Sequence, residues 1–146
     1  MSAALSVEIT LTNRPEERPR LLEGLEGFAR EHRLSGAVRQ AIDLALEEHF
    51  TNILKYAYDD QALHTIRVRL ELDDRAVLIQ IEDDGRPFNL LARPAVNTAV
   101  PLESKPIGGL GIHLIVHSMD HVQYERRGEK NFLSLRKQLT EPPASG

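Results

Sequence analysis

Residues 46–58, LEEHFTNILKYAY, are the stretch that indicates the fold of this chain most directly. Glu48 and Asn52 are four residues apart, so a helix places both side chains on one face, and Lys55 continues that face. The amide oxygen of Asn52 is a hard ligand suited to Mg²⁺, and Lys55 offsets phosphate charge. Glu48 orients or accepts the proton of an attacking hydroxyl. Taken alone, the three residues are better explained as a solvated helix face with Glu–Lys pairing.

A second motif, DDGRPF at residues 83–88, follows an apolar strand. The carboxylate of Asp83 is an acceptor for the exocyclic amino group of adenine. Gly85 removes a side chain at a place where a ligand has to approach the backbone. Asp-Asp-Gly is also common turn chemistry, so a surface turn after the strand is the alternative explanation.

A third motif, GGLGI at residues 108–112, opens a predicted helix. Exposed backbone N–H groups and the positive end of the helix dipole form a binding site for phosphate. A glycine-rich helix start is a weak signal by itself, and the spacing matches neither the P-loop nor the Rossmann pattern. The predicted phosphate-binding residues are Gly108, Gly109, Leu110 and Gly111.

Most of the remaining chain shows strand or helix periodicity. The expected strands are 5–12, 65–72, 76–82, 121–127 and 131–138, and the expected helices are 16–32, 36–58 and 109–119. Ser35 is the predicted cap of the second helix. Residues 84–107 carry four prolines and little periodicity, which predicts a long loop that covers a ligand as a lid.

This order of elements predicts an α+β fold, a two-layer sandwich with helices on one face of a mixed sheet. The length of 146 residues fits one domain, expected over residues 1–140, with a disordered tail at 141–146. The absence of cysteine excludes disulfides and thiolate metal sites. A net charge of −4 without a Lys/Arg block argues against nucleic-acid binding. No signal peptide or membrane span is visible, so a cytoplasmic protein is expected.

The three motifs together supply a base with a Mg²⁺ ligand, an adenine acceptor and a phosphate cradle, in that order along the chain. As a set they resemble the N, G1 and G2 boxes of the GHKL ATPase superfamily, which has the Bergerat ATP-binding fold. Within it the chain is similar to anti-sigma-factor serine/threonine kinases of the RsbW/SpoIIAB type. The resemblance covers nearly the whole chain.

The resemblance implies a role for each matching residue. Asn52 holds Mg²⁺, Glu48 is the catalytic carboxylate, and Asp83 reads adenine beside Gly85. Gly109 and Gly111 bracket the triphosphate of ATP. Ser134, on the last strand, shares a water molecule with Asp83 near the adenine.

Four histidine or tyrosine positions are interpreted separately. These kinases usually carry His-Ala or His-Gly four residues after the asparagine, whereas this chain has Tyr56-Ala57, and Lys-Tyr at this point is more typical of sensor histidine kinases. His49 stands where a small apolar residue is more usual, and is interpreted as a core or interface histidine rather than a ligand. His113 and His117 have metal-ligand spacing, but without a third ligand a chance pair is the better explanation.

The implied function is transfer of phosphate from ATP to a serine or threonine of a small STAS-type anti-sigma-factor antagonist. A sigma factor is a further implied partner, and a homodimer is an option. A non-catalytic switch, whose affinity for a partner changes with nucleotide, is the main alternative. The ATPase part of a histidine kinase is disfavoured, because residues 1–35 begin with a strand and leave no room for a phosphoacceptor hairpin. A generic α+β binding module, the last alternative, predicts no nucleotide affinity.

Overall fold

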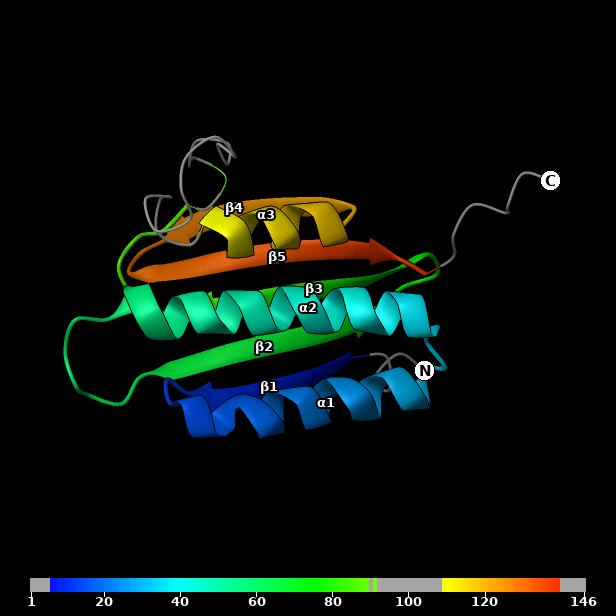
Figure 1. The fold of residues 1–146 in the computed structure, drawn as a ribbon, viewed down its shortest axis with the longest axis horizontal. Coiled ribbons are helices and arrows are strands. Elements are labelled where there is room, and N and C mark those ends of the chain that lie inside the picture. The colour runs from blue at the N-terminus through cyan, green and yellow to red at the C-terminus, as the bar shows by residue number, and fades with distance from the viewer. Residues whose placement is uncertain (1–5, 90, 92–108, 140–146) are drawn as a thin grey trace.

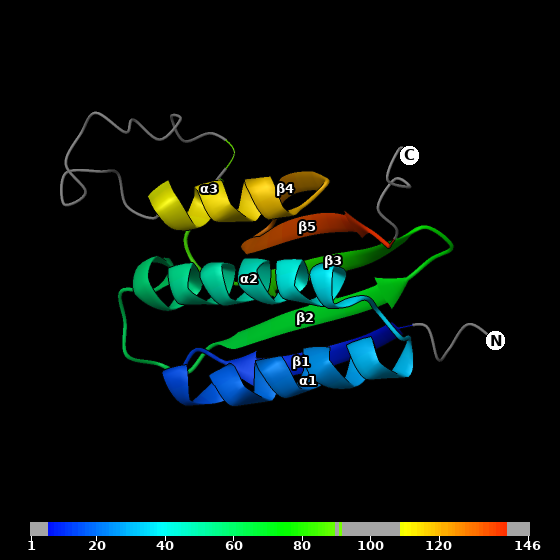
Figure 2. The ribbon, with the colours of Figure 1, turned by 45° about the vertical axis from the view of Figure 1, so that its right-hand side comes forward.

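The computed structural model describes residues 6–89, 91 and 109–139 and shows a two-layer α+β fold. Three helices cover one face of a five-stranded sheet, and no described helix covers the other face (Figure 1, Figure 2). The strands are β1 (Ser6–Thr12), β2 (Thr65–Leu72), β3 (Ala76–Asp83), β4 (His121–Arg127) and β5 (Lys130–Gln138), and the helices are α1 (Arg18–Glu31), α2 (Gly36–Asn52) and α3 (Gly109–Ser118). The predicted fold class is therefore confirmed.

The strands form where the sequence alternates between apolar and polar residues. In β2, Ile66, Val68 and Leu70 are buried against the helices, while the residues between them are exposed. The turn into β3 is closed by Asp73, whose carboxylate accepts hydrogen bonds at 2.7 Å from the backbone N–H groups of Arg75 and Ala76. An aspartate that bonds the backbone two residues on is a common way to fix a tight hairpin.

The predicted mixed sheet is wrong, because every pairing between neighbouring strands is antiparallel. The strand order is β1-β2-β3-β5-β4. β4 follows a helix and runs in the same direction as β3, but β5 lies between the two. These two parallel strands are thereby separated by an antiparallel one, and no two neighbouring strands among the described residues are parallel.

The second helix begins as predicted and ends differently. The hydroxyl of Ser35 accepts a hydrogen bond from the backbone N–H of Val38 at 3.2 Å, which confirms the cap. The expected continuous helix over 36–58 is wrong at its end, because Ile53–Ala57 form a π-helical turn. Such turns occur often at functional sites. Since a π-helical turn changes the angular spacing of its residues, the simple continuation of the Glu48–Asn52 face to Lys55 no longer follows.

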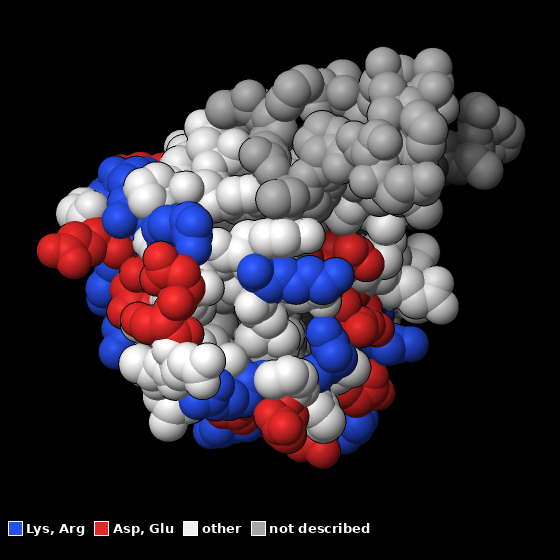
Figure 3. Space-filling model, turned by 60° about the vertical axis from the view of Figure 1, so that its left-hand side comes forward, with Lys and Arg blue, Asp and Glu red and all other residues white. Residues whose placement is uncertain are grey.

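The remaining parts of the chain add three observations. Most of the lid predicted at 84–107 and the tail predicted at 141–146 lie outside the described residues. No described helix is both long and apolar enough to cross a bilayer. On the face seen in Figure 3, acidic and basic side chains are interspersed and neither sign forms a continuous field.

Candidate functional site

The end of α2 faces the start of α3. Glu48 is half-buried and Asn52 is 6% exposed. A Cβ atom at Gly111 would lie 2.8 Å from a carboxylate oxygen of Glu48 and 3.7 and 3.8 Å from the two amide atoms of Asn52. The first and third sequence motifs are therefore in contact, and glycine at 111 leaves room for the Glu48 carboxylate.

The carboxylate of Asp83 lies at the end of β3 and is 3% exposed. Its Oδ1 accepts hydrogen bonds at 2.9 Å from the backbone N–H of Gly85 and from the amide Nδ2 of Asn131. Burial raises the pKa of Asp83 above its ordinary value, and these two donors act against that rise. Asp83 is thus an acceptor held in a fixed orientation inside the protein.

Asn131, which the sequence analysis did not select, connects this carboxylate to the last hairpin. Its amide Nδ2 also donates to the carbonyl oxygen of Arg86 at 2.9 Å, and its Oδ1 accepts from the hydroxyl of Tyr124 and the guanidinium of Arg126. Arg126 donates in turn to the carbonyl oxygen of Gly85 at 2.8 Å. The segment after β3 is therefore anchored to β4 and β5 through one buried side chain.

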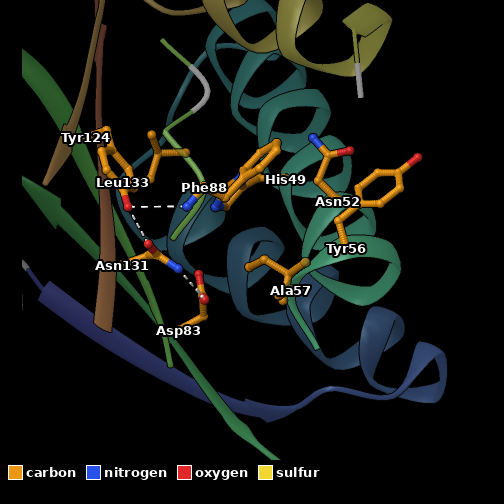
Figure 4. Close-up of a pocket in the computed structure, with 10 residues that line it drawn as sticks. His49, Asn52, Tyr56, Ala57, Asp83, Phe88, Tyr124, Asn131 and Leu133 are labelled. Atoms are coloured by element: carbon orange, nitrogen blue, oxygen red, sulfur yellow. Dashed lines mark hydrogen bonds between the residues drawn. The ribbon is translucent and has the colours of Figure 1, made fainter. Parts of the chain in front are cut away.

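Asn52 and Asp83 line one pocket together with Asn131 and Tyr124 (Figure 4). The pocket therefore brings a residue of the first motif, Asn52, together with a residue of the second, Asp83. The contact at Gly111 brings the first and third motifs together in the same way. Its free volume of about 10 Å³ holds about one water molecule. Entry of a purine ring therefore requires the lining side chains to move apart.

The predicted role of Ser134 beside Asp83 is wrong. Asp83 pairs with Asn131 across β3 and β5, and Ser134 pairs with Gln80. Side chains alternate between the faces of a sheet, so Ser134 points to the face opposite the Asp83 carboxylate. It lines a separate hollow with Gln80 there. The alternation along β5 could have identified Asn131 from the sequence. Leu133 and Leu135 face the core, and Asn131, two residues before Leu133, lies on the same face of the strand.

The other predicted site residues are placed as follows. Lys55 is exposed and is not among the residues that line the pocket. Gly109 and Leu110 begin α3, and Gly108 lies outside the described residues. His49 is 5% exposed, so its interpretation as a buried histidine is confirmed. Burial lowers the pKa of His49 to about 4.

Gly85 is required by packing as well as by its place in the motif. A Cβ atom there would lie 2.5 Å from the Cβ of Ala57 and 2.7 Å from its carbonyl oxygen. That same carbonyl accepts a hydrogen bond from the backbone N–H of Arg86 at 3.0 Å. The reason given from the sequence, approach of a ligand, is thus not the contact seen: the close neighbour is the π-helical turn.

Replacing Gly85 by alanine is expected to lower the free energy of unfolding by about 1–3 kcal/mol, the usual cost of forcing an atom into a packed site. Gly27 is the matched control, because a Cβ there meets nothing within 4 Å and the residue lies inside α1. Gly27→Ala is expected to raise stability by about 0.5–1 kcal/mol. Urea unfolding measures both, and equal stability of Gly85→Ala and the parent protein contradicts the packing argument.

A polar cluster lies beside the pocket, around His64. The ring of His64 stacks on Tyr58 with centroids 3.9 Å apart, and its two nitrogens face Asp60 at 2.9 Å and Asp84 at 3.3 Å. The hydroxyl of Tyr58 donates to Asp84 at 2.9 Å. The hydrogen bond with Asp60, followed by that with Asp84, raises the pKa of His64, although partial burial opposes the rise.

This raised pKa predicts a pH-dependent contribution to stability. Because the folded-state pKa of His64 exceeds its unfolded value of about 6.5, the contribution is complete below that pH and is lost as pH rises through the folded-state pKa. The free energy of unfolding of the parent, minus that of His64→Gln, should therefore be constant below about pH 6.5 and fall as the pH rises above it. His49 contributes equally to both proteins and cancels in the difference. Parallel urea-unfolding profiles across this range contradict the prediction.

The family model of the histidine kinase-like ATPase domain matches residues 11–137, which include every motif described above. The chain belongs to this family. The resemblance of the chain to the GHKL ATPase superfamily is thereby confirmed, and the fold described above is a histidine kinase-like ATPase domain.

Two known proteins are similar to this histidine kinase-like ATPase domain. The serine/threonine-protein kinase BtrW of Bordetella bronchiseptica is 29% identical over 111 residues, covering 76% of this chain and 78% of BtrW. The crystal structure of the RsbU and RsbW domains of Rv1364c from Mycobacterium tuberculosis superposes with a TM-score of 0.65 at 14% identity, over 94% of this chain. The match spans 33% of the mycobacterial chain and shows a shared fold.

Proposed function

We propose that this chain is an ATP-dependent serine/threonine protein kinase that acts as an anti-sigma factor. Its substrate would be a serine of a small STAS-type antagonist. The observation that supports the proposal best is the convergence of three motifs on one place: Asn52 shares a pocket with Asp83 and, with Glu48, lies against Gly111. The similarity to BtrW, which is named a serine/threonine-protein kinase, favours transfer to protein over ATP hydrolysis alone.

Asn52 is the residue proposed to hold Mg²⁺. Its amide is buried, and its Nδ2 has no hydrogen-bond partner among the described residues. An amide this far from water is costly unless a ligand or water completes its bonding, and its oxygen is a donor type that Mg²⁺ accepts. When bound, Mg²⁺ would neutralise phosphate charge. The amide oxygen of Asn52 therefore fits the ion, and its unpaired Nδ2 suits an acceptor such as a phosphate oxygen.

The proposed reaction moves the γ-phosphoryl group from ATP to the serine hydroxyl, with the hydroxyl proton leaving to a carboxylate. Glu48 is the carboxylate available for that proton, because it lies beside Asn52 and Gly111. The N-terminus of α3 and Lys55 would stabilise negative charge on the phosphates. Phosphoryl transfer has a loose transition state, so positioning and charge neutralisation supply most of the rate enhancement.

The base of the nucleotide would bind in the pocket between α2 and the end of β3. Asp83 offers an oriented acceptor for the exocyclic amino group of adenine, since Gly85 and Asn131 hold its other oxygen. A site built to hydrogen-bond one group rejects analogues that lack it. We therefore propose that ATP is bound in preference to GTP.

A transfer assay tests the proposal. The purified protein is incubated with γ-labelled ATP and Mg²⁺, together with an STAS protein encoded beside it, and the label on the STAS protein is followed. A variant of the STAS protein without the acceptor serine is the control. Stoichiometric labelling that depends on the serine supports the kinase. Tight ATP binding without any transfer contradicts it and favours the nucleotide-dependent switch.

A further inference from the structure

His49 is a polar side chain in the wall of the pocket, and the three motifs do not explain why it is there. It follows Glu48 in α2, is 5% exposed, and lines the same pocket as Asp83 and Asn131. Figure 4 shows its ring extending from α2 towards the other side chains that line the pocket. The ring and the Asp83 carboxylate therefore line the same pocket.

The Nδ1 atom of His49 is buried and has no hydrogen-bond partner among the described residues. Buried polar atoms in native proteins are bonded in the great majority of cases, so an unpaired one needs an explanation. A leucine at this position would fill the same space without an unpaired polar atom. The imidazole therefore carries a cost to the free protein that a contact with a ligand would offset.

The chemistry of the pocket indicates which group of a ligand would form a hydrogen bond with Nδ1 of His49. Its walls include Ile53, Ala57 and Leu133, which suit the faces of an aromatic ring. A neutral imidazole carries one N–H donor and one acceptor. Asp83 would accept a hydrogen bond from an exocyclic amino group, whereas the ring nitrogens of a purine are acceptors, so the group complementary to them is a donor.

We propose that His49 is a base-reading residue, whose Nδ1–H donates a hydrogen bond to a ring nitrogen of the bound purine. This inference rests on the proposed function, because it assigns a second polar contact in the same nucleotide pocket. It gives the pocket two opposed hydrogen bonds, an acceptor at Asp83 and a donor at His49. Such a pair fixes the orientation of the base as well as its identity.

The first test compares the stability and the MgATP affinity of His49→Leu with those of the parent, and only the affinity should fall. Removing an unpaired buried polar atom while keeping the volume should leave the unfolding free energy of the free protein unchanged or higher. The Kd for MgATP, measured by calorimetry, should rise by about tenfold, the usual effect of one lost hydrogen bond. Loss of affinity without loss of stability distinguishes a ligand contact from a structural role.

Phe50→Leu is the matched control. Phe50 is the next residue in α2 and is 3% exposed, but it does not line the pocket. The truncation should lower the free energy of unfolding and leave the Kd for MgATP at the parental value. This pattern is the reverse of that expected for His49→Leu, so a general effect of altering α2 cannot produce both.

The second test identifies the bond with 1-deaza, 3-deaza and 7-deaza forms of ATP, in which one ring nitrogen is replaced by C–H. One of the three should bind the parent about tenfold more weakly than ATP, but bind His49→Leu as well as ATP does. An unchanged Kd for ATP in His49→Leu overturns the inference while the proposed function stands. If His49→Leu weakens the binding of ATP and of all three analogues by the same factor, the inference is also overturned, because the imidazole ring then only supports the shape of the pocket. Absence of ATP binding to the parent overturns both.

Discussion

Replacing Glu48 by glutamine is expected to lower the rate of phosphoryl transfer by about 10²–10⁴-fold, the range for loss of a general acid–base group. Glutamine keeps the length and shape of the side chain that lies against Gly111, so the packing between α2 and α3 should be retained. The Kd for MgATP should stay within about twofold of the parental value, because this interaction acts on the transferred proton rather than on binding. Single-turnover transfer to the STAS protein and calorimetry provide the two numbers.

Glu47 is the control for this experiment. It is the preceding residue in α2, and its carboxylate faces Arg18 at 4.0 Å rather than Gly111. Glu47→Gln should transfer phosphate at close to the parental rate. A Glu48→Gln variant that transfers as fast as the parent would show that another group accepts the hydroxyl proton.

Replacing Asp83 by asparagine is expected to raise the Kd for ATP by about 10–100-fold, which corresponds to the loss of one charge-assisted hydrogen bond. Asparagine keeps one oxygen to accept from Gly85 and Asn131, so the segment after β3 should stay in place. Its amide nitrogen would face the adenine amino group, and two donors cannot bond to each other. Binding should therefore fall while the free energy of unfolding changes little.

Glu82→Gln is the matched control for Asp83→Asn. Glu82 is the preceding residue of β3, points to the opposite face of the sheet, and pairs with Lys130 at 2.8 Å. The change removes the same charge one residue away from the pocket, so the Kd for ATP should not change. Equal affinities of the parent and Asp83→Asn contradict the assignment of Asp83 as the adenine acceptor.

The sequence was sufficient to predict the five described strands and the three α-helices, because each depends on local patterns. Ile66, Val68 and Leu70 alternate and become the core face of β2, and Ser35 precedes an apolar helical stripe and caps it. The motifs could likewise be placed on the ends of these elements. Their convergence was an expectation from resemblance, and the contacts at Gly111 and in the Asp83 pocket are what the folded chain adds.

The features that sequence analysis missed depend on contacts between distant segments. The π-helical turn at 53–57 has no local sequence signal, and Gly85 is required by its contact with Ala57 in that turn. Asn131 could have been predicted, because it is two residues from Leu133 and therefore lies on the core face of β5. Ser134 is one residue from Leu133 and lies on the opposite face. The cluster around His64 joins residues 58–64 to Asp84, a contact that only the tertiary structure reveals.

A crystal structure with a non-hydrolysable ATP analogue and Mg²⁺ would place the nucleotide relative to all three motifs at once. We expect one bound nucleotide, with its adenine at Asp83 and His49 and its phosphates between Glu48, Asn52 and the start of α3. An analogue bound on the helix-free face of the sheet, or with its phosphates remote from Asn52 and Gly111, would contradict it.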